Sequence, residues 1–174
     1  MDFKDLVKQR RSIRKFTEQE LAQDDVVTIM RAALMSPSSH NTRAWQFVLV
    51  DDKDMLKRLS ETRPMGAELL AGAALAVVVC VDSEVSNVWI EDAAIAAYGI
   101  QLQAEDLGLG SCWVQVRNRQ AEDGTPTEDL VREMLNIPAN VNVLCMVALG
   151  HKAMPRNPQN EEKLMWEKLH IGQY

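Results

Sequence analysis

The chain lacks the features that would direct it to a membrane or to nucleic acid. It has no apolar run of the roughly 18 residues that a membrane span needs, and its first residues, MDFKDLVKQRR, contain no apolar segment of the kind found in signal peptides. The formal net charge is −6, so neither nucleic acid nor an anionic membrane is expected as the main partner. We therefore expect a cytoplasmic protein.

Cysteine is scarce and shows no ligand pattern. Cys80, Cys112 and Cys145 are odd in number, lie far apart and sit within apolar runs, and the three histidines show no metal-ligand spacing with them. Reduced thiols in the core are favoured over a disulfide or metal framework, and no metal site is expected. A reactive Cys112 remains an alternative to a small buried side chain.

Familiar catalytic and nucleotide-binding motifs are also missing. The chain contains no GxGxxG, no P-loop and no nucleophile elbow, and a Ser/His/Asp or Cys/His hydrolase cannot be built from spacing alone. No repeat, low-complexity segment or linker divides it. With 174 residues, 47% of them hydrophobic, it fits one domain over 1–174 with a real core, and the polar, proline-bearing stretch 151–174 is expected to form a C-terminal arm.

The stretch from Trp89 to Val116 is the centre of the chain. Between Ala93 and Leu102 nearly every residue is small or apolar, which is typical of a helix buried in a core or an interface. Gly108 and Gly110 supply the backbone freedom to end this helix, and a strand is expected from Ser111 to Val116. One small domain rarely surrounds a helix completely, so the pattern favours a homodimer.

Hydrophobic periodicity and turn residues predict the other elements. Helices are expected over 3–9, from a Thr17-x-x-Glu20 capping box to Met35, around Met55, Leu56 and Leu59 with an end before Pro64, and for a turn or two within 65–74. A last helix is expected over 126–135, with Pro126 at N1 and Glu128 at N3 of its cap. Strands are expected over 45–50, 75–81, 111–116 and 141–149. The run 75–81 is almost continuously apolar, as in a strand buried on both faces. Helices and strands mix without a βαβ rhythm, so the predicted class is α+β.

Two polar stretches are candidates for a binding site. The sequence from Arg10 to Phe16 places four cations within six residues beside the hydroxyl of Ser12, and is either a solvated face or an anion site suited to phosphate. The stretch from Ser36 to Thr42 is either an ordinary loop or a cradle for a polar cofactor.

Four segments together resemble the nitroreductase family of FMN-dependent oxidoreductases. They are RRSIRKF, SPSSHNTRAWQFVLV, EDAAIAAYGIQLQAEDLGLGSCWVQV and IPANVNVLCMVALGH, which cover almost the whole chain in the expected order. The chain is similar to a short member of this family. The resemblance implies a mixed sheet of four to five strands flanked by helices in an interlocked homodimer, with FMN at the subunit interface and NAD(P)H as electron donor.

The resemblance also assigns roles to individual residues. Arg14 and Gln115 are the catalytic candidates, with Arg14 at the pyrimidine edge of the flavin and the backbone N–H of Gln115 near its N5 atom. The expected cofactor-binding residues are Arg10, Arg11 and Ser12 for the phosphate and ribityl chain, Ser38, Ser39 and Asn41 reaching over from the partner subunit, Asp92 and Val114 beside the ring, and Lys163 as a second phosphate cation.

The chain departs from the family pattern in two places. Relatives often follow the PSSxN turn with Gln-Pro, where this chain has Arg43-Ala44, so the turn is expected to differ in shape. Some relatives carry an Asn or Lys before the second strand to hold the pyrimidine ring, whereas here the segment is MGAEL, over 65–69. Only backbone groups, with Gly66 as the candidate, could replace that side chain.

The resemblance implies a ping-pong oxidoreductase that passes hydride from NAD(P)H through FMN to an organic acceptor such as a nitroaromatic or a quinone. Three alternatives remain. The chain could be a flavin-binding sensor or carrier with little turnover, a branch that uses FMN for dehydrogenation or dehalogenation, or a cofactor-free α+β interaction module. The cation-rich segment near Ser12 disfavours the last of these.

Overall fold

The computed structural model describes residues 1–174 and contains five α-helices and one four-stranded sheet. The helices are α1 (Phe3–Gln9), α2 (Gln23–Leu34), α3 (Lys53–Ser60), α4 (Trp89–Asp106) and α5 (Thr127–Leu135), and the strands are β1 (Trp45–Val50), β2 (Leu75–Asp82), β3 (Gly110–Gln115) and β4 (Val141–Gly150). Four 3-10 turns, η1 (Ser39–Asn41), η2 (Glu68–Gly72), η3 (Glu161–Lys163) and η4 (Trp166–Lys168), complete the list. The predicted α+β class is confirmed.

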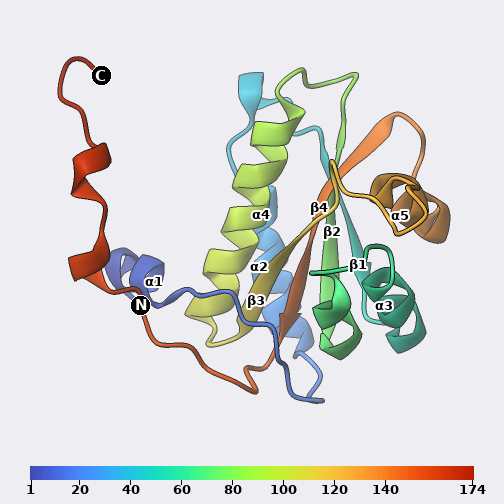
Figure 1. Ribbon diagram of the computed structural model, residues 1–174, viewed down its shortest axis with the longest axis horizontal. Helices are drawn as coiled ribbons and strands as arrows, with labels where there is room; N and C mark the ends of the chain where they lie inside the picture. Colours follow the sequence, from blue (N-terminus) through green and yellow to red (C-terminus); the bar gives the residue numbers. More distant parts are fainter.

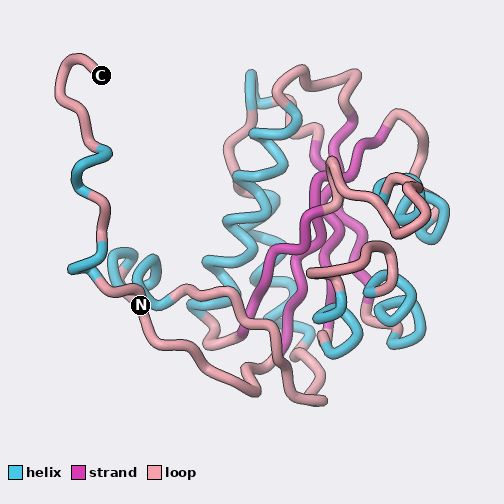
Figure 2. The backbone as a smooth tube through the Cα atoms, viewed as in Figure 1, coloured by secondary structure: helices cyan, strands magenta, loops and turns pink.

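The sheet forms the middle layer of three. Its strand order is β1-β2-β4-β3, with α2 and α4 on one face and α3, η2 and α5 on the other (Figures 1 and 2). Every neighbouring pair of strands is antiparallel, so the expected mixed sheet is corrected in this detail. The only parallel pairing is an isolated bridge between Ser12 and Ser111, and it is too short to form a fifth strand.

Strand β2 lies at the centre of the core, as its apolar run predicted. Successive side chains of a strand point to opposite faces, so Val77 and Val79 pack beneath α2 and α4, whereas Val78 and Cys80 pack beneath α3 and α5. All four residues are almost completely buried. The strand is apolar on both faces because helices cover both sides of the sheet, although the sheet is antiparallel.

Helix α4 is buried on one side only. Ala93, Ala97 and Ile100 are fully buried against the sheet and α2, whereas Ile95 and Tyr98 on the opposite side are 44% and 42% exposed. The expectation of a completely buried helix is therefore not met within a single chain. Apolar side chains at positions exposed to solvent mark a surface that could be covered by another molecule.

The expected capping box at Thr17 does not form. Helix α2 begins at Gln23, and the preceding residue Ala22 makes no side-chain cap. The backbone N–H of Thr17 instead donates to the carbonyl of His151 at 2.9 Å, and Phe16 pairs with Lys152. These contacts hold the chain extended where the local pattern predicted helix.

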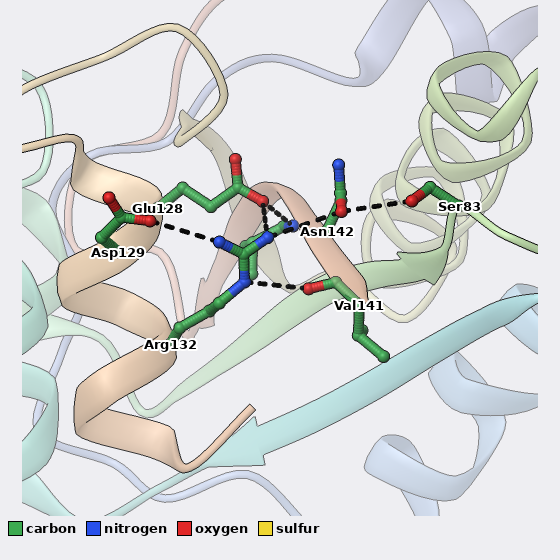
Figure 3. A network of polar contacts seen from close by, with 7 residues as sticks. Ser83, Glu128, Asp129, Arg132, Val141 and Asn142 are labelled. Carbon is green, nitrogen blue, oxygen red and sulfur yellow. Dashed lines mark hydrogen bonds and ion pairs between the residues drawn. The ribbon is translucent and has the colours of Figure 1, made fainter. Parts of the chain in front are cut away.

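The start of α5 is held by a polar network rather than by the predicted cap (Figure 3). The Glu128 carboxylate accepts bonds of 2.8 Å from the Arg132 guanidinium and from the backbone N–H of Val143, so it cannot close a capping box. Arg132 also donates to the Val141 carbonyl at 3.1 Å. This network fixes α5 against the start of β4, and it moves the helix start to Thr127, one residue later than predicted.

The C-terminal arm has two parts. Residues 151–161 run beside the N-terminal segment, to which they are tied by bonds such as Ala153 N–H to the Lys15 carbonyl at 3.0 Å. The remainder extends away from the three layers beside α1 (Figure 1), and its apolar side chains Trp166 and Leu169 are 67% and 66% exposed. No helix in the chain combines the length and the apolar character needed to cross a bilayer.

Candidate functional site

Two facing glycines allow residues 10–16, here called the basic segment, to lie against the sheet. Gly110 of β3 and Gly150 of β4 are paired in register. A Cβ on Gly110 would lie 2.8 Å from Ile13 Cγ2, and one on Gly150 would lie 2.9 Å from Phe16 Cδ1. Because the sheet has no side chains here, the segment lies close enough for Ile13 N–H to donate to the Ser111 carbonyl at 2.9 Å.

The basic segment and the arm together form a cationic pocket of about 260 Å³. Its lining contains four arginines, one hydroxyl and one amide, from Arg10, Arg11, Ser12, Arg14, Arg156 and Gln159. No carboxylate is among them. Guanidinium groups present several N–H donors in a fixed plane, so this pocket has the chemistry of an anion site, and in particular of a phosphate site.

The arm shapes this pocket. Arg11 Nη1 donates to the backbone carbonyl of Asn157, and Gln159 N–H donates to the Lys8 carbonyl at 2.9 Å. Arg156 is a pocket residue that the sequence reasoning missed, because only the fold brings it beside the N-terminal segment. Lys163, expected as the second phosphate cation, is exposed in η3 and does not line the pocket.

Gln115 lies at the other end of β3 and presents its backbone to an open edge. Val116 N–H donates to Leu144 of β4, so the alternation of an antiparallel pair directs the N–H and C=O of Gln115 away from β4. The Gln115 side chain is held by Trp113 Nε1 and by the Arg117 carbonyl, each at 2.8 Å. Val114 is fully buried, so only its backbone could reach a ligand.

Arg63 is a second residue that the sequence reasoning missed. Its Nη1 donates to the Gln115 carbonyl at 2.8 Å, and its Nε donates to the carbonyl of Met65. A Cβ at Gly66 would lie 2.5 Å from Arg63 Nη2, so the guanidinium occupies space that a side chain at Gly66 would fill. The Gly66 N–H, expected to replace a missing side chain, donates to the carboxylate of Glu68.

The polar turn 38–41 is fixed to the first turn of α4. Asp92 accepts a bond from Ser39 N–H at 2.9 Å and another from the Ser86 hydroxyl at 2.7 Å. It is 4% exposed and holds the turn, although the resemblance placed it beside the flavin ring. Arg43 binds two side chains of the turn: its backbone N–H donates to Ser38 Oγ and its Nε donates to Asn41 Oδ1, each at 2.9 Å.

The turn and the residues just after it have an unusual backbone. His40, Asn41 and Arg43 all have positive φ, between 49° and 55°, which is the left-handed region that residues other than glycine seldom adopt. The hydroxyl of Thr42 is buried without a hydrogen-bond partner. The turn therefore differs from a plain loop.

The turn and the cationic pocket lie at opposite ends of α4. The turn contacts Asp92 in the first helical turn, whereas Glu105 in the last turn pairs with Lys152 at 2.6 Å, beside the basic segment (Figure 1). A helix of 18 residues is about 27 Å long. One chain thus brings together the arginines and the edge of β3, and it leaves the turn apart from the arginines.

Cys112 lies beneath the basic segment. It is 2% exposed, and burial raises the pKa of its thiol despite the nearby cations of Arg14 and Arg10 and a hydrogen bond with Ser12. Burial raises the pKa of Cys80 and Cys145 as well, and all three cysteines are unpaired. The three cysteines lie in the core, as predicted, and the environment of Cys112 disfavours a thiolate nucleophile.

Comparison with known proteins gives the family. The family model described as "Nitroreductase family" matches residues 7–63 and 63–151. The chain belongs to the nitroreductase family. A relative from Archaeoglobus fulgidus, provisionally named NADH dehydrogenase/NAD(P)H nitroreductase, is 36% identical over 82% of this chain and 80% of its own length. A protein of Methanothermobacter thermautotrophicus with the same provisional name is 32% identical over 100% of this chain and 88% of its own.

Solved structures of the nitroreductase family share this fold. An FMN-dependent nitroreductase from Clostridium difficile R20291 superposes with a TM-score of 0.95 at 42% identity, covering 97% of this chain and 98% of that one. The resemblance to the nitroreductase family and the predicted fold are therefore confirmed.

The residues present fit FMN. Its phosphate suits the carboxylate-free arginine pocket, and its ring system suits the open edge of β3, where the Gln115 N–H points outward beside the Arg63 guanidinium. Both features lie along one strand, because Ile13 contacts β3 at Ser111 and Arg63 contacts it at Gln115. Ser111 and Gln115 are four residue steps apart, or about 14 Å of extended strand.

Proposed function

We propose that this nitroreductase-family chain is an FMN-dependent NAD(P)H oxidoreductase that reduces small organic acceptors in the cytoplasm. The observation that carries the proposal is the alignment of an arginine pocket and an outward backbone N–H along one edge of β3. The similar C. difficile protein, named as FMN-dependent, supports the same cofactor here. The three unpaired thiols support a reducing compartment.

The arginine pocket would hold the cofactor by its phosphate. A pair of unit charges 4 Å apart attracts by about 4 kcal/mol at an effective dielectric near 20, before desolvation is subtracted. Arg10 and Arg156 can therefore retain FMN without a covalent link, while Arg11 keeps the arm in place. Arg156 would be the second phosphate cation, the role that the family resemblance assigned to Lys163. Arg14, which is exposed, would extend toward the pyrimidine edge.

The edge of β3 would orient the ring. The Gln115 peptide is held by the sheet on one side and by Arg63 on the other, so its N–H is already directed before a ligand arrives. A donor in a fixed position holds the reacting atom at short range without further ordering. A bound FMN would supply the two-electron chemistry that links NAD(P)H to a quinone or nitro compound, with NAD(P)⁺ leaving before the acceptor binds and the protons coming from solvent.

A second copy of the chain would complete the site. The exposed apolar residues of α4, the buried Thr42 hydroxyl without a partner, and the extended arm with its exposed Trp166 all favour a homodimer. In such a dimer the turn at Ser38, Ser39 and Asn41 could reach the cofactor of the partner, since within one chain it lies at the far end of α4 from the arginines.

The test is turnover by the purified protein loaded with FMN. We expect NADPH or NADH to be oxidised in the presence of a quinone or a nitroaromatic, with parallel lines in a double-reciprocal plot, as a ping-pong mechanism requires. Retention of FMN without oxidation of either nicotinamide would contradict the enzyme and favour the flavin-binding sensor or carrier. A protein that shows no flavin absorbance, even after FMN is added, would refute the proposal itself.

A further inference from the structure

We propose that Arg63 is a positioning residue of the flavin site, which fixes the Gln115 peptide and supplies beside it the positive charge that no residue of the segment 65–74 provides. This inference rests on the proposed function. It goes beyond it because it assigns a new residue and a specific effect, a preference of the site for the reduced over the oxidised cofactor.

The segment between Arg63 and β2 contains no cation. From Met65 to Ala74 the chain carries no lysine, arginine or histidine, and its one charge is the carboxylate of Glu68. The Gly66 N–H cannot substitute, because that carboxylate accepts its hydrogen bond. Hydrogen bonds from backbone N–H groups, including that of Gly66, lower the pKa of Glu68, so this carboxylate stays negative near neutral pH.

The Arg63 guanidinium lies beside both Gln115 and Gly66. It is half-buried, it donates from Nη1 to the Gln115 carbonyl at 2.8 Å, and its Nη2 occupies the space beside Gly66. The Gln115 N–H lies on the same open edge of β3 as the carbonyl that Arg63 binds. A ring that faced this N–H would therefore lie beside a guanidinium that still has unused donors out of its five.

Arg63 keeps its positive charge although it is partly buried. Burial, and then repulsion from Arg119, lower the pKa of Arg63, yet arginine starts from a value so high that it stays protonated. Its positive charge is thus held near the ring position at the expense of solvation. A fixed charge of this kind attracts the cofactor more strongly in the form that carries additional negative charge.

The experiment compares the wild type with R63Q, R63K and the control R58Q. Arg58 is an exposed arginine in the last turn of α3, so R58Q makes the same change of charge away from the site. The readouts are the dissociation constant for oxidised FMN and the midpoint potential of the bound flavin. Urea unfolding of each apo-protein reports whether the change disturbs the fold.

We expect R63Q to shift the ratio of affinities for reduced and oxidised FMN about tenfold toward the oxidised form. For a two-electron couple this corresponds to a midpoint potential lower by about 30 mV. R63K should recover much of the potential because it keeps the charge, but less of the affinity, because an ammonium lacks the planar fork that reaches two carbonyls. R58Q should behave as the wild type.

A purely structural Arg63 gives a different result. R63Q and R63K would then weaken both forms of FMN equally and leave the potential at the wild-type value, and this outcome would overturn the inference while leaving the proposed function intact. A wild type that does not bind FMN would instead remove the proposed function, and the role of Arg63 with it.

Discussion

Asp92 and Ser39 are joined by a hydrogen bond of 2.9 Å across 53 positions of sequence. The carboxylate of Asp92 also accepts a bond from the Ser86 hydroxyl, so a single buried side chain ties the turn before β1, the loop after β2 and the start of α4. The turn and Arg43 just after it contain three residues in the left-handed region and need such support, because each of these conformations is individually unfavourable.

Replacing Asp92 should loosen the turn. D92A leaves a partly buried N–H and a buried hydroxyl without their acceptor, and we expect the free energy of unfolding to fall by about 1–3 kcal/mol. D92N keeps one acceptor oxygen and should lose less. Urea denaturation followed by circular dichroism measures both variants. Equal stability of D92A and the wild type would show that the turn does not depend on this contact.

The two lysine–glutamate pairs at the arm should contribute unequally to stability. Lys152 and Glu105 lie 2.6 Å apart with side chains 19% and 7% exposed, whereas Lys8 and Glu161 lie 3.2 Å apart and are 40% and 69% exposed. Removing one partner of a buried pair leaves an uncompensated charge, so K152A should destabilise the fold by about 3 kcal/mol. K8A should cost less than about 1 kcal/mol.

Thermal and urea unfolding of K152A and K8A in parallel check this contrast. The matched double variant E105Q K152A should recover stability if the loss comes from the buried carboxylate of Glu105. Similar losses for K152A and K8A would contradict the difference in burial.

The exposed side of α4 should carry the contact between two copies. Placing a carboxylate there, as in I95E and Y98E, opposes burial of this apolar surface. We therefore expect the wild type to be a dimer at micromolar concentration and both variants to be monomers. Sedimentation velocity distinguishes the two states. E133A on α5, on the other side of the sheet, is the control. A monomeric wild type would contradict the homodimer and the shared site.

The buried thiols predict a loss of stability at alkaline pH. Burial raises the pKa of Cys80 to about 12 from 9.0, and it raises those of Cys112 and Cys145. Above pH 9 the unfolded chain therefore releases thiol protons that the folded chain retains. The stabilising effect is complete below pH 9 and is lost progressively as the pH rises toward 12.

Urea midpoints measured between pH 8 and pH 11 test this effect. The wild type should lose stability over this range, and C80A should lose less, since one of the three thiols is gone. Lysines and tyrosines that titrate in the same range are common to both proteins. Parallel pH profiles of wild type and C80A would contradict the role of Cys80.

Local sequence patterns predicted much of the fold and the basic segment of the site. The β1 bounds, the helix over 3–9 and the basic cluster at Arg10 to Arg14 follow from residues close together in the chain. The predicted cap at Thr17 was wrong because the fold gives its N–H to His151. Patterns of neighbouring residues cannot show that a distant strand end competes for the same donor.

The missing parts of the site have the same origin. Arg156 and Arg63 carry no local signal, since each becomes a site residue only when the arm reaches Arg11 and when the loop after α3 reaches Gln115. The exposed side of α4 was equally hidden, because an apolar helix reads the same whether its own chain or a second copy covers it.

The most direct test of the arginine pocket compares FMN with riboflavin, which has the same ring but no phosphate. Flavin fluorescence quenching with wild type, R10A and R156A gives the dissociation constants, and R31A on the exposed end of α2 serves as the control. The wild type and R31A should bind FMN at least about 100-fold more tightly than riboflavin, and R156A and R10A should each reduce that ratio about tenfold or more. Equal affinity of the wild type for the two flavins, or a ratio unchanged in R156A and R10A, would contradict the phosphate site on which the proposed function depends.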